Sequence, residues 1–216
     1  MTTELQNPEV AETAADYFGV FGLPRKLNLD LARLEKEFYR MSRKLHPDLY
    51  VNRPTAEQER ALQMSSQLND AYRTLKDPVT RTQYLLSLEG VQLEEQSKAA
   101  TDHARTTGEE KKQIVPPDLL EEVFELNMQL QEMKASGGQD PEAREQLETA
   151  KKNFEVRLES LGSELRQRWH EWDAVIERNG TPESAERGKV RDAMVDLLNR
   201  RSYIRNLVRD VNEALK

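Results

Sequence analysis

Apolar residues recur at alternating intervals of three and four positions through most of this chain. A clear example is the series Leu31, Leu34, Phe38, Met41 and Leu45. These intervals place side chains on one face of an α-helix, whereas a half-buried strand needs strict alternation. No convincing alternating run of Val, Ile and Thr occurs. The chain is therefore predicted to be all-α.

Proline and glycine divide the helical pattern into two regions. We expect a flexible N-terminal tail over residues 1–15, followed by short helices that include an antiparallel hairpin over residues 16–90. A polar linker is expected over residues 91–115 and a second helical region over residues 116–216. Breaks at Gly137-Gly138 and Asn179-Gly180 separate three long helices in the last region. Short connections make neighbouring helices antiparallel, so this region is predicted to be a three-helix bundle.

Several boundaries and core positions can be predicted as well. Asn28 or Asp30 should cap the helix that ends before Pro47, and a loop should follow it through Pro54. The last long helix should begin with Thr181 as its cap and Pro182 at its first position. Further core positions expected from the helical spacing are Met64, Leu68 and Leu75 in the first region, and Val123, Phe154, Trp169, Trp172, Met194 and Ile204 in the second.

Composition excludes several classes of function. The net charge of −7 makes generic nucleic-acid binding unfavourable. Because the chain has no cysteine, it has no disulfide, thiolate metal ligand or cysteine nucleophile. Its 3 histidines are too dispersed to form a ligand set, so neither a metal nor a cofactor is expected. The sequence begins without a secretory signal and contains no long apolar stretch, so a cytoplasmic protein without a membrane contact is expected.

A basic helix leads into the tripeptide His46-Pro47-Asp48. Asp30 to Leu45 holds five basic and three acidic residues in a chain of net charge −7. An isolated His-Pro-Asp tripeptide fits an ordinary turn, because proline ends a helix and aspartate caps the next one. Here it lies between two amphipathic helices, where a fixed imidazole and carboxylate could bind a partner. The basic residues opposite the apolar stripe are Arg33, Lys36, Arg40, Arg43 and Lys44.

Four motifs in order resemble the J-domain, the module that stimulates ATP hydrolysis in DnaK-type chaperones. They are Asp16-Tyr17-Phe18, His46-Pro47-Asp48, Leu68-Asn69-Asp70-Ala71-Tyr72 and Leu75-Lys76-Asp77-Pro78. The run from Tyr84 to Gly90 further resembles the HscB subfamily of J-domain co-chaperones. The resemblance implies that His46, Pro47, Asp48 and the five basic residues bind an HscA- or DnaK-type ATPase chaperone.

The helix that starts near Asp118 carries a second apolar line beside its core stripe. Leu120, Phe124 and Met128 are spaced by four residues, with Glu121 and Glu125 beside them. This line could face a partner, or it could widen the face that a bundle helix needs for two neighbours. HscB-type proteins bind the iron–sulfur scaffold IscU through a C-terminal three-helix domain. The resemblance implies the following scaffold-binding residues: Leu120, Phe124, Glu125, Met128 and Tyr203.

The sequence as a whole favours an adaptor without catalytic activity, which activates a chaperone and delivers an IscU-type scaffold for iron–sulfur cluster assembly. One alternative is a J-domain co-chaperone for another client. A second is a helical interaction protein without catalysis, although the glycine breaks favour helices that fold back over one long coiled coil. An enzyme is not expected, because no phosphate-binding loop, metal spacing or nucleophile–base set occurs.

Overall fold

The computed structural model describes residues 16–91, 93, 115–178 and 184–216. Within these ranges the regular secondary structure is helical throughout, which confirms the predicted all-α class. The predicted tail lies outside the described residues, and so does nearly all of the predicted linker.

The chain divides into two compact units, and each unit is described by itself. Unit 1 contains Met1–Glu89 together with Trp169–Pro182. Unit 2 contains Gly90–Arg168 together with Glu183–Lys216. The main difference between this division and the ranges expected from the sequence concerns Trp169–Pro182. The segment that begins at Trp169, which the sequence assigns to the bundle, belongs with the N-terminal helices.

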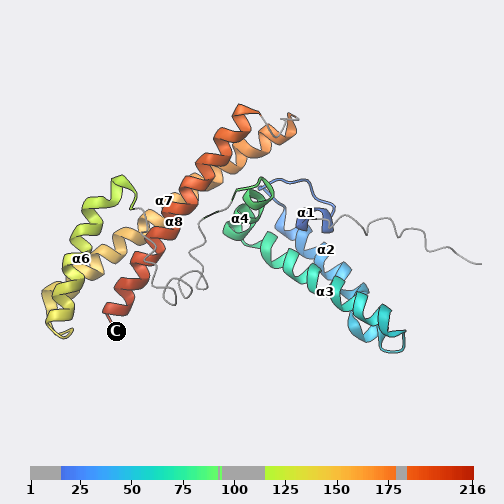
Figure 1. Ribbon diagram of the computed structural model, residues 1–216, viewed down its shortest axis with the longest axis horizontal. Helices are drawn as coiled ribbons and strands as arrows, with labels where there is room; N and C mark the ends of the chain where they lie inside the picture. The colour runs from blue at the N-terminus through green and yellow to red at the C-terminus, as the bar shows by residue number, and fades with distance from the viewer. Residues whose placement is uncertain (1–15, 92, 94–114, 179–183) are drawn as a thin grey trace, which may run out of the picture. The chain divides into compact units, whose positions relative to one another are not determined.

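Unit 1 is built around a helical hairpin. Figure 1 shows α2 and α3 lying side by side, as the antiparallel pair expected from the sequence. Asp30 caps α2 by accepting a hydrogen bond from the Arg33 amide. A short 3₁₀ helix, η1, occupies the region predicted to be a loop. The elements of this unit outside Trp169–Pro182 are α1 (Tyr17–Val20), α2 (Leu31–Lys44), η1 (Pro47–Tyr50), α3 (Thr55–Lys76) and α4 (Pro78–Leu88).

Leu34, Leu68 and Leu75 are buried in unit 1, as the helical spacing predicts. Leu31 and Met64 are each 43% exposed, although they belong to the predicted stripes. Ala61 is buried instead. The stripe residues Phe38, Met41 and Leu45 are half-buried. Periodicity identifies the residues that share a helix face, but it does not show how much of that face a neighbouring element covers.

The end of α7 completes the core of unit 1. Trp169 is buried and donates a hydrogen bond from Nε1 to the Thr82 hydroxyl at 3.0 Å. Trp172 is fully buried and donates from Nε1 to the Arg25 carbonyl at 3.1 Å. The prediction that both tryptophans are core residues is confirmed. Their partners are Thr82 on α4 and Arg25 in the segment between α1 and α2.

Unit 2 begins with η2 (Pro117–Leu119) and α6 (Leu120–Ala135). It also contains the whole of α8 (Ala185–Ala214) and most of α7 (Pro141–Glu177). Gly137 and Gly138 have positive φ angles of 63° and 82°, which glycine adopts without a Cβ penalty, and they turn the chain between α6 and α7. Ser184 caps α8, so this helix begins three residues later than the predicted start at Pro182. Thr181 and Pro182 themselves lie outside the described residues.

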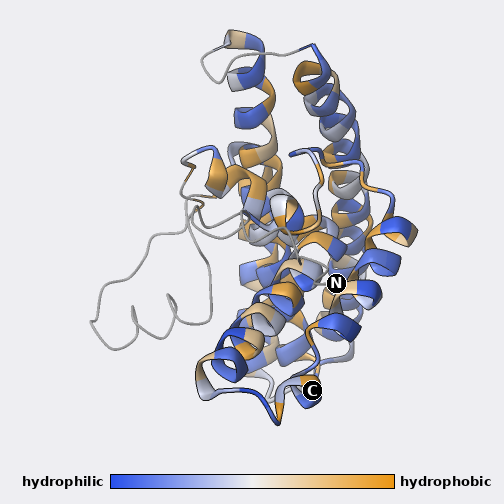
Figure 2. Cartoon of the chain, turned by 90° about the vertical axis from the view of Figure 1, so that its right-hand side faces the viewer, coloured by the Kyte–Doolittle hydropathy of each residue, from blue (hydrophilic) through white to orange (hydrophobic). Residues whose placement is uncertain are grey.

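The core of unit 2 follows the predicted helical stripes. Val123, Phe154, Met194 and Ile204 are all buried. In Figure 2 the long helices carry hydrophobic residues along one side and hydrophilic residues along the other. The apolar sides of α6, α7 and α8 supply this core, which confirms the predicted C-terminal helical bundle.

Candidate functional site

The tripeptide His46-Pro47-Asp48 follows directly after α2 and is exposed. The side chains of His46 and Asp48 are 56% and 82% exposed. The Asp48 amide donates a hydrogen bond to Nδ1 of His46 at 3.3 Å. In a neutral ring this bond leaves the proton on Nε2, which is then available as a donor to a partner. The tripeptide therefore presents a donor and a carboxylate acceptor together.

Hydrogen bonds from both flanking helices fix the loop that carries the tripeptide. The Tyr50 hydroxyl donates to the Lys44 carbonyl at the end of α2. From α3, the side-chain amide of Gln58 donates to the carbonyls of Val51 and Arg53, at 3.2 and 2.8 Å. A loop held in this way loses less conformational entropy when it binds a partner.

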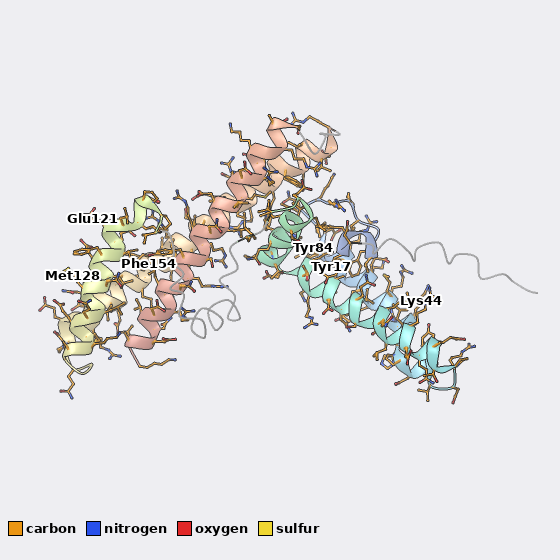
Figure 3. All side chains as sticks on the ribbon, viewed as in Figure 1. Tyr17, Lys44, Tyr84, Glu121, Met128 and Phe154 are labelled. Atoms are coloured by element: carbon orange, nitrogen blue, oxygen red, sulfur yellow. The ribbon has the colours of Figure 1, made fainter. Side chains whose placement is uncertain are left out.

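The basic residues of α2 remain available to a negatively charged partner. Arg40 pairs with Glu37 at 2.7 Å, one turn away on the same helix. Among the described residues, no carboxylate lies within ion-pair distance of Lys36 or Lys44. Figure 3 marks Lys44 near the end of α2 that leads into the tripeptide. Arg33 and Arg43 are exposed on the same helix.

The first helix of unit 1 is fixed to α4 by stacked rings. The rings of Tyr17 and Tyr84 stack with centroids 4.4 Å apart, and the two residues are adjacent in Figure 3. Burial raises the pKa of the Tyr84 hydroxyl. Asp16 caps α1. Partial burial alone would raise the pKa of Asp16, but hydrogen bonds from the Gly19 amide and Arg25 outweigh it and lower the pKa below 3.8.

A second candidate surface lies on α6 in unit 2. Leu120, Phe124 and Met128 are 55%, 66% and 49% exposed, whereas Val123 and Leu126 on the other side of the helix are buried. The structure thus resolves the alternative left open by the sequence, because the second apolar line does not face the bundle core. We call Leu120, Phe124 and Met128 the α6 apolar face.

Acidic residues border the α6 apolar face. Glu121 and Glu125 are exposed on the same helix. In Figure 3, Glu121 and Met128 lie on the side of α6 away from α7, while Phe154 lies between the two helices. A partner for this surface needs an apolar groove, and basic groups at its rim would complement the glutamates.

Ion pairs attach the start of α6 to the other helices of unit 2. One carboxylate oxygen of Asp118 accepts hydrogen bonds from Arg157 at 2.9 Å and from Arg200 at 2.8 Å. Arg157 also pairs with Glu122 at 2.9 Å. Single ion pairs at such partly exposed positions contribute little, but a shared carboxylate restrains the orientation of α6.

Tyr203 differs from the other candidate residues of unit 2 because it is only 6% exposed. Burial raises the pKa of its hydroxyl. Tyr203 on α8 therefore belongs to the core of unit 2. Any contact with a partner would involve little of its surface.

The structure also reveals exposed apolar residues that the sequence analysis did not single out as site residues. Tyr39 on α2, and Leu49 and Val51 beside the tripeptide, are 55%, 61% and 64% exposed. For Tyr39, the available signal was its position outside the apolar stripe of α2. Among the described residues, no cluster of three acidic or histidine side chains is placed to hold a metal ion. No helix in the described ranges has the length and hydropathy to cross a membrane.

Comparison with known proteins assigns the N-terminal region to a known domain. The DnaJ domain family matches residues 16–84. The co-chaperone protein HscB homolog of Vibrio cholerae is 34% identical over 128 residues, which make up 59% of this chain and 66% of that protein. The HscB homolog of Bordetella petrii is 40% identical over 91 residues, covering 42% of this chain and 54% of the homolog. The alignments thus span about half to two thirds of these relatives.

Solved structures agree with this assignment at the level of the fold. Chaperone HscB from Vibrio cholerae has a TM-score of 0.55 at 24% identity, with 92% of this chain and 96% of the other covered. Human co-chaperone protein HscB has a TM-score of 0.56 at 18% identity, with 99% and 91% covered. The J-domain match, the sequence relatives and the shared fold together show that the chain belongs to the HscB family of J-domain co-chaperones.

Proposed function

We propose that this protein stimulates the ATPase of an HscA- or DnaK-type chaperone and delivers an IscU-type iron–sulfur scaffold protein to it. The observation that carries the proposal is the exposed His46-Pro47-Asp48 tripeptide at the end of the basic helix α2. In this proposal the protein acts as an adaptor and catalyses no reaction itself. The co-chaperone names of the relatives support this role.

Chaperone docking in this proposal combines two interactions. Lys36 and Lys44 attract an acidic surface of the chaperone and accelerate the encounter. Asp48 then accepts hydrogen bonds from the chaperone, most favourably from an arginine that binds both carboxylate oxygens. The hydrogen bonds that hold the loop support this step, because the tripeptide is already ordered before it binds.

Scaffold binding in this proposal uses the α6 apolar face. An exposed Phe or Leu side chain that becomes fully buried stabilises a complex by about 1.5–3 kcal/mol. Glu125 lies beside Phe124 and would pair with a basic group of the scaffold. Tyr203, which the family resemblance also implicates, is buried and would contribute mainly to the stability of the unit that carries this surface.

The first experiment measures the steady-state ATPase rate of an HscA-type chaperone with and without its IscU-type scaffold, as this protein is added. We expect the protein to raise the rate, and to raise it further when the scaffold is present. His46→Gln should abolish the stimulation without loss of helix content, because the His46 side chain is exposed.

Two other results would contradict parts of the proposal. An ATPase rate that rises to the same extent with and without the scaffold would mean that the co-chaperone acts on another client. No stimulation of either an HscA-type or a DnaK-type ATPase would refute the chaperone-activating role.

A further inference from the structure

Tyr39 is an exposed aromatic residue within the basic surface of α2. Its side chain is 55% exposed, although it lies in the middle of the helix. Lys36 precedes it by three residues and Arg43 follows it by four, which places both next to Tyr39 on the helix surface. A partner that approaches these cations must therefore also meet the tyrosine ring.

The ring of Tyr39 is supported by an aromatic row that continues to α3. Its centroid lies 5.4 Å from that of Phe38, and Phe38 stacks on Tyr72 at 4.1 Å. The Tyr72 hydroxyl donates to Glu35, and the ammonium of Lys76 lies over the Tyr72 ring. Because the Tyr39 ring already contacts a row that spans both helices, it loses less side-chain freedom on being covered than an isolated side chain would.

Tyr39 is also linked to the residues next to the tripeptide. Arg43 folds back and donates from Nε to the Tyr39 carbonyl at 3.2 Å. Tyr39 and Arg43 are four residues apart and share one side of α2, and the chain leaves the helix at Leu45, directly before His46. Tyrosine and arginine are the residue types enriched among those that dominate binding energies at interfaces.

We propose that Tyr39 is a contact residue for the ATPase chaperone, and that its ring packs against an apolar position bordered by acidic groups. This inference rests on the proposed function and extends it. The cations of α2 supply charge attraction, which screening by salt weakens, whereas the ring supplies a contact that salt does not screen. Acidic groups at this border would complement Lys36 and Arg43, which have no carboxylate within ion-pair distance in the described part of the chain.

The test is an ATPase titration without scaffold, in which the full-length protein is added to the chaperone at increasing concentration. Tyr39→Ala should raise the concentration needed for half-maximal stimulation by about tenfold, the usual effect of truncating a dominant contact. The maximal rate should stay unchanged, because the tripeptide is intact. Tyr39→Phe keeps the ring and should stay within about twofold of the wild type.

The matched control is Val156→Ala, which shortens an apolar side chain that is 63% exposed in unit 2. It should leave the titration unchanged, and circular dichroism should show that every variant is folded. A shift for Tyr39→Ala no larger than that for Val156→Ala would overturn the inference, as would an equal shift for Tyr39→Phe. No stimulation by the wild-type protein would instead overturn the proposed function, before any variant is compared.

Discussion

Asp173 is a buried carboxylate that joins distant parts of the sequence within unit 1. It accepts hydrogen bonds from the Leu27 amide at 2.7 Å, and from the Asn28 amide and side chain at 2.9 Å each. Asp173 is only 8% exposed. Hydrogen bonds to a charged acceptor are stronger than neutral ones, and they offset the cost of burying the carboxylate.

We expect Asp173→Asn to lower the free energy of unfolding of unit 1 by about 1–3 kcal/mol. The variant removes the charge and turns an NH₂ group towards the backbone amide of Leu27 or Asn28, which can only donate. Urea unfolding followed by tryptophan fluorescence measures this unit, because the chain's 2 tryptophans, Trp169 and Trp172, both belong to it.

The control for this prediction is Glu177→Gln on the same helix. Glu177 pairs with Lys26 at 2.7 Å, but its side chain is 63% exposed. Exposed ion pairs contribute little to stability, so this variant should change the free energy of unfolding much less. Equal effects of the two substitutions would show that burial of Asp173 does not matter.

The predictability of a residue's role depended on whether its partners are local in sequence. The tripeptide and the basic residues of α2 were identified because spacing and neighbours define them. Asp173 was not identified, because it resembles any polar residue between helical stripe positions. Its partners are separated from it by 145 and 146 residues, so no local pattern can indicate the contact.

At the scale of elements, α6 has two apolar lines with different environments. The periodicity of the sequence predicts both lines, since each follows the helical repeat. It cannot decide whether the second one is covered, because a bundle helix can need a wide apolar face. The burial of Val123 and the exposure of Phe124 make that distinction.

Two substitutions on α6 should separate binding from stability. Phe124→Ala should weaken scaffold binding by tenfold or more while it changes the free energy of unfolding by less than about 1 kcal/mol. Leu126→Ala, at a position 1% exposed, should lower that free energy by about 2–5 kcal/mol. Calorimetric titration with the scaffold and thermal unfolding measure the two quantities. A stability loss for Phe124→Ala as large as for Leu126→Ala would show that α6 packs differently.

At the scale of the whole molecule, one helix contributes to both compact units. The apolar stripe of α7 continues without interruption from Leu147 to Trp172, so the sequence assigns the whole helix to the bundle. A continuous stripe shows that one face is covered, but it does not identify the elements that cover it. The contacts of Trp169 and Trp172 with Thr82 and Arg25 show that the helix end belongs to unit 1. The hydrogen bonds of Asp173 and the ion pair of Glu177 agree with this.

The two proposed surfaces lie in different units of one chain, and this arrangement leads to a prediction. Linking two binding sites raises the effective concentration of one partner near the other. His46→Gln should retain scaffold binding but lose ATPase stimulation, and Phe124→Ala should show the reverse. An equimolar mixture of both variants contains each intact surface, although never both on one molecule.

This mixture should fail to restore the additional, scaffold-dependent stimulation seen with the wild-type protein. The Phe124→Ala molecules still activate the chaperone, but they bring no scaffold to it, while the His46→Gln molecules sequester the scaffold. ATPase rates at matched total protein concentrations measure the difference. Full restoration by the mixture would mean that the scaffold reaches the chaperone without being carried by the same chain, and the adaptor role would then be wrong even though each surface binds its partner.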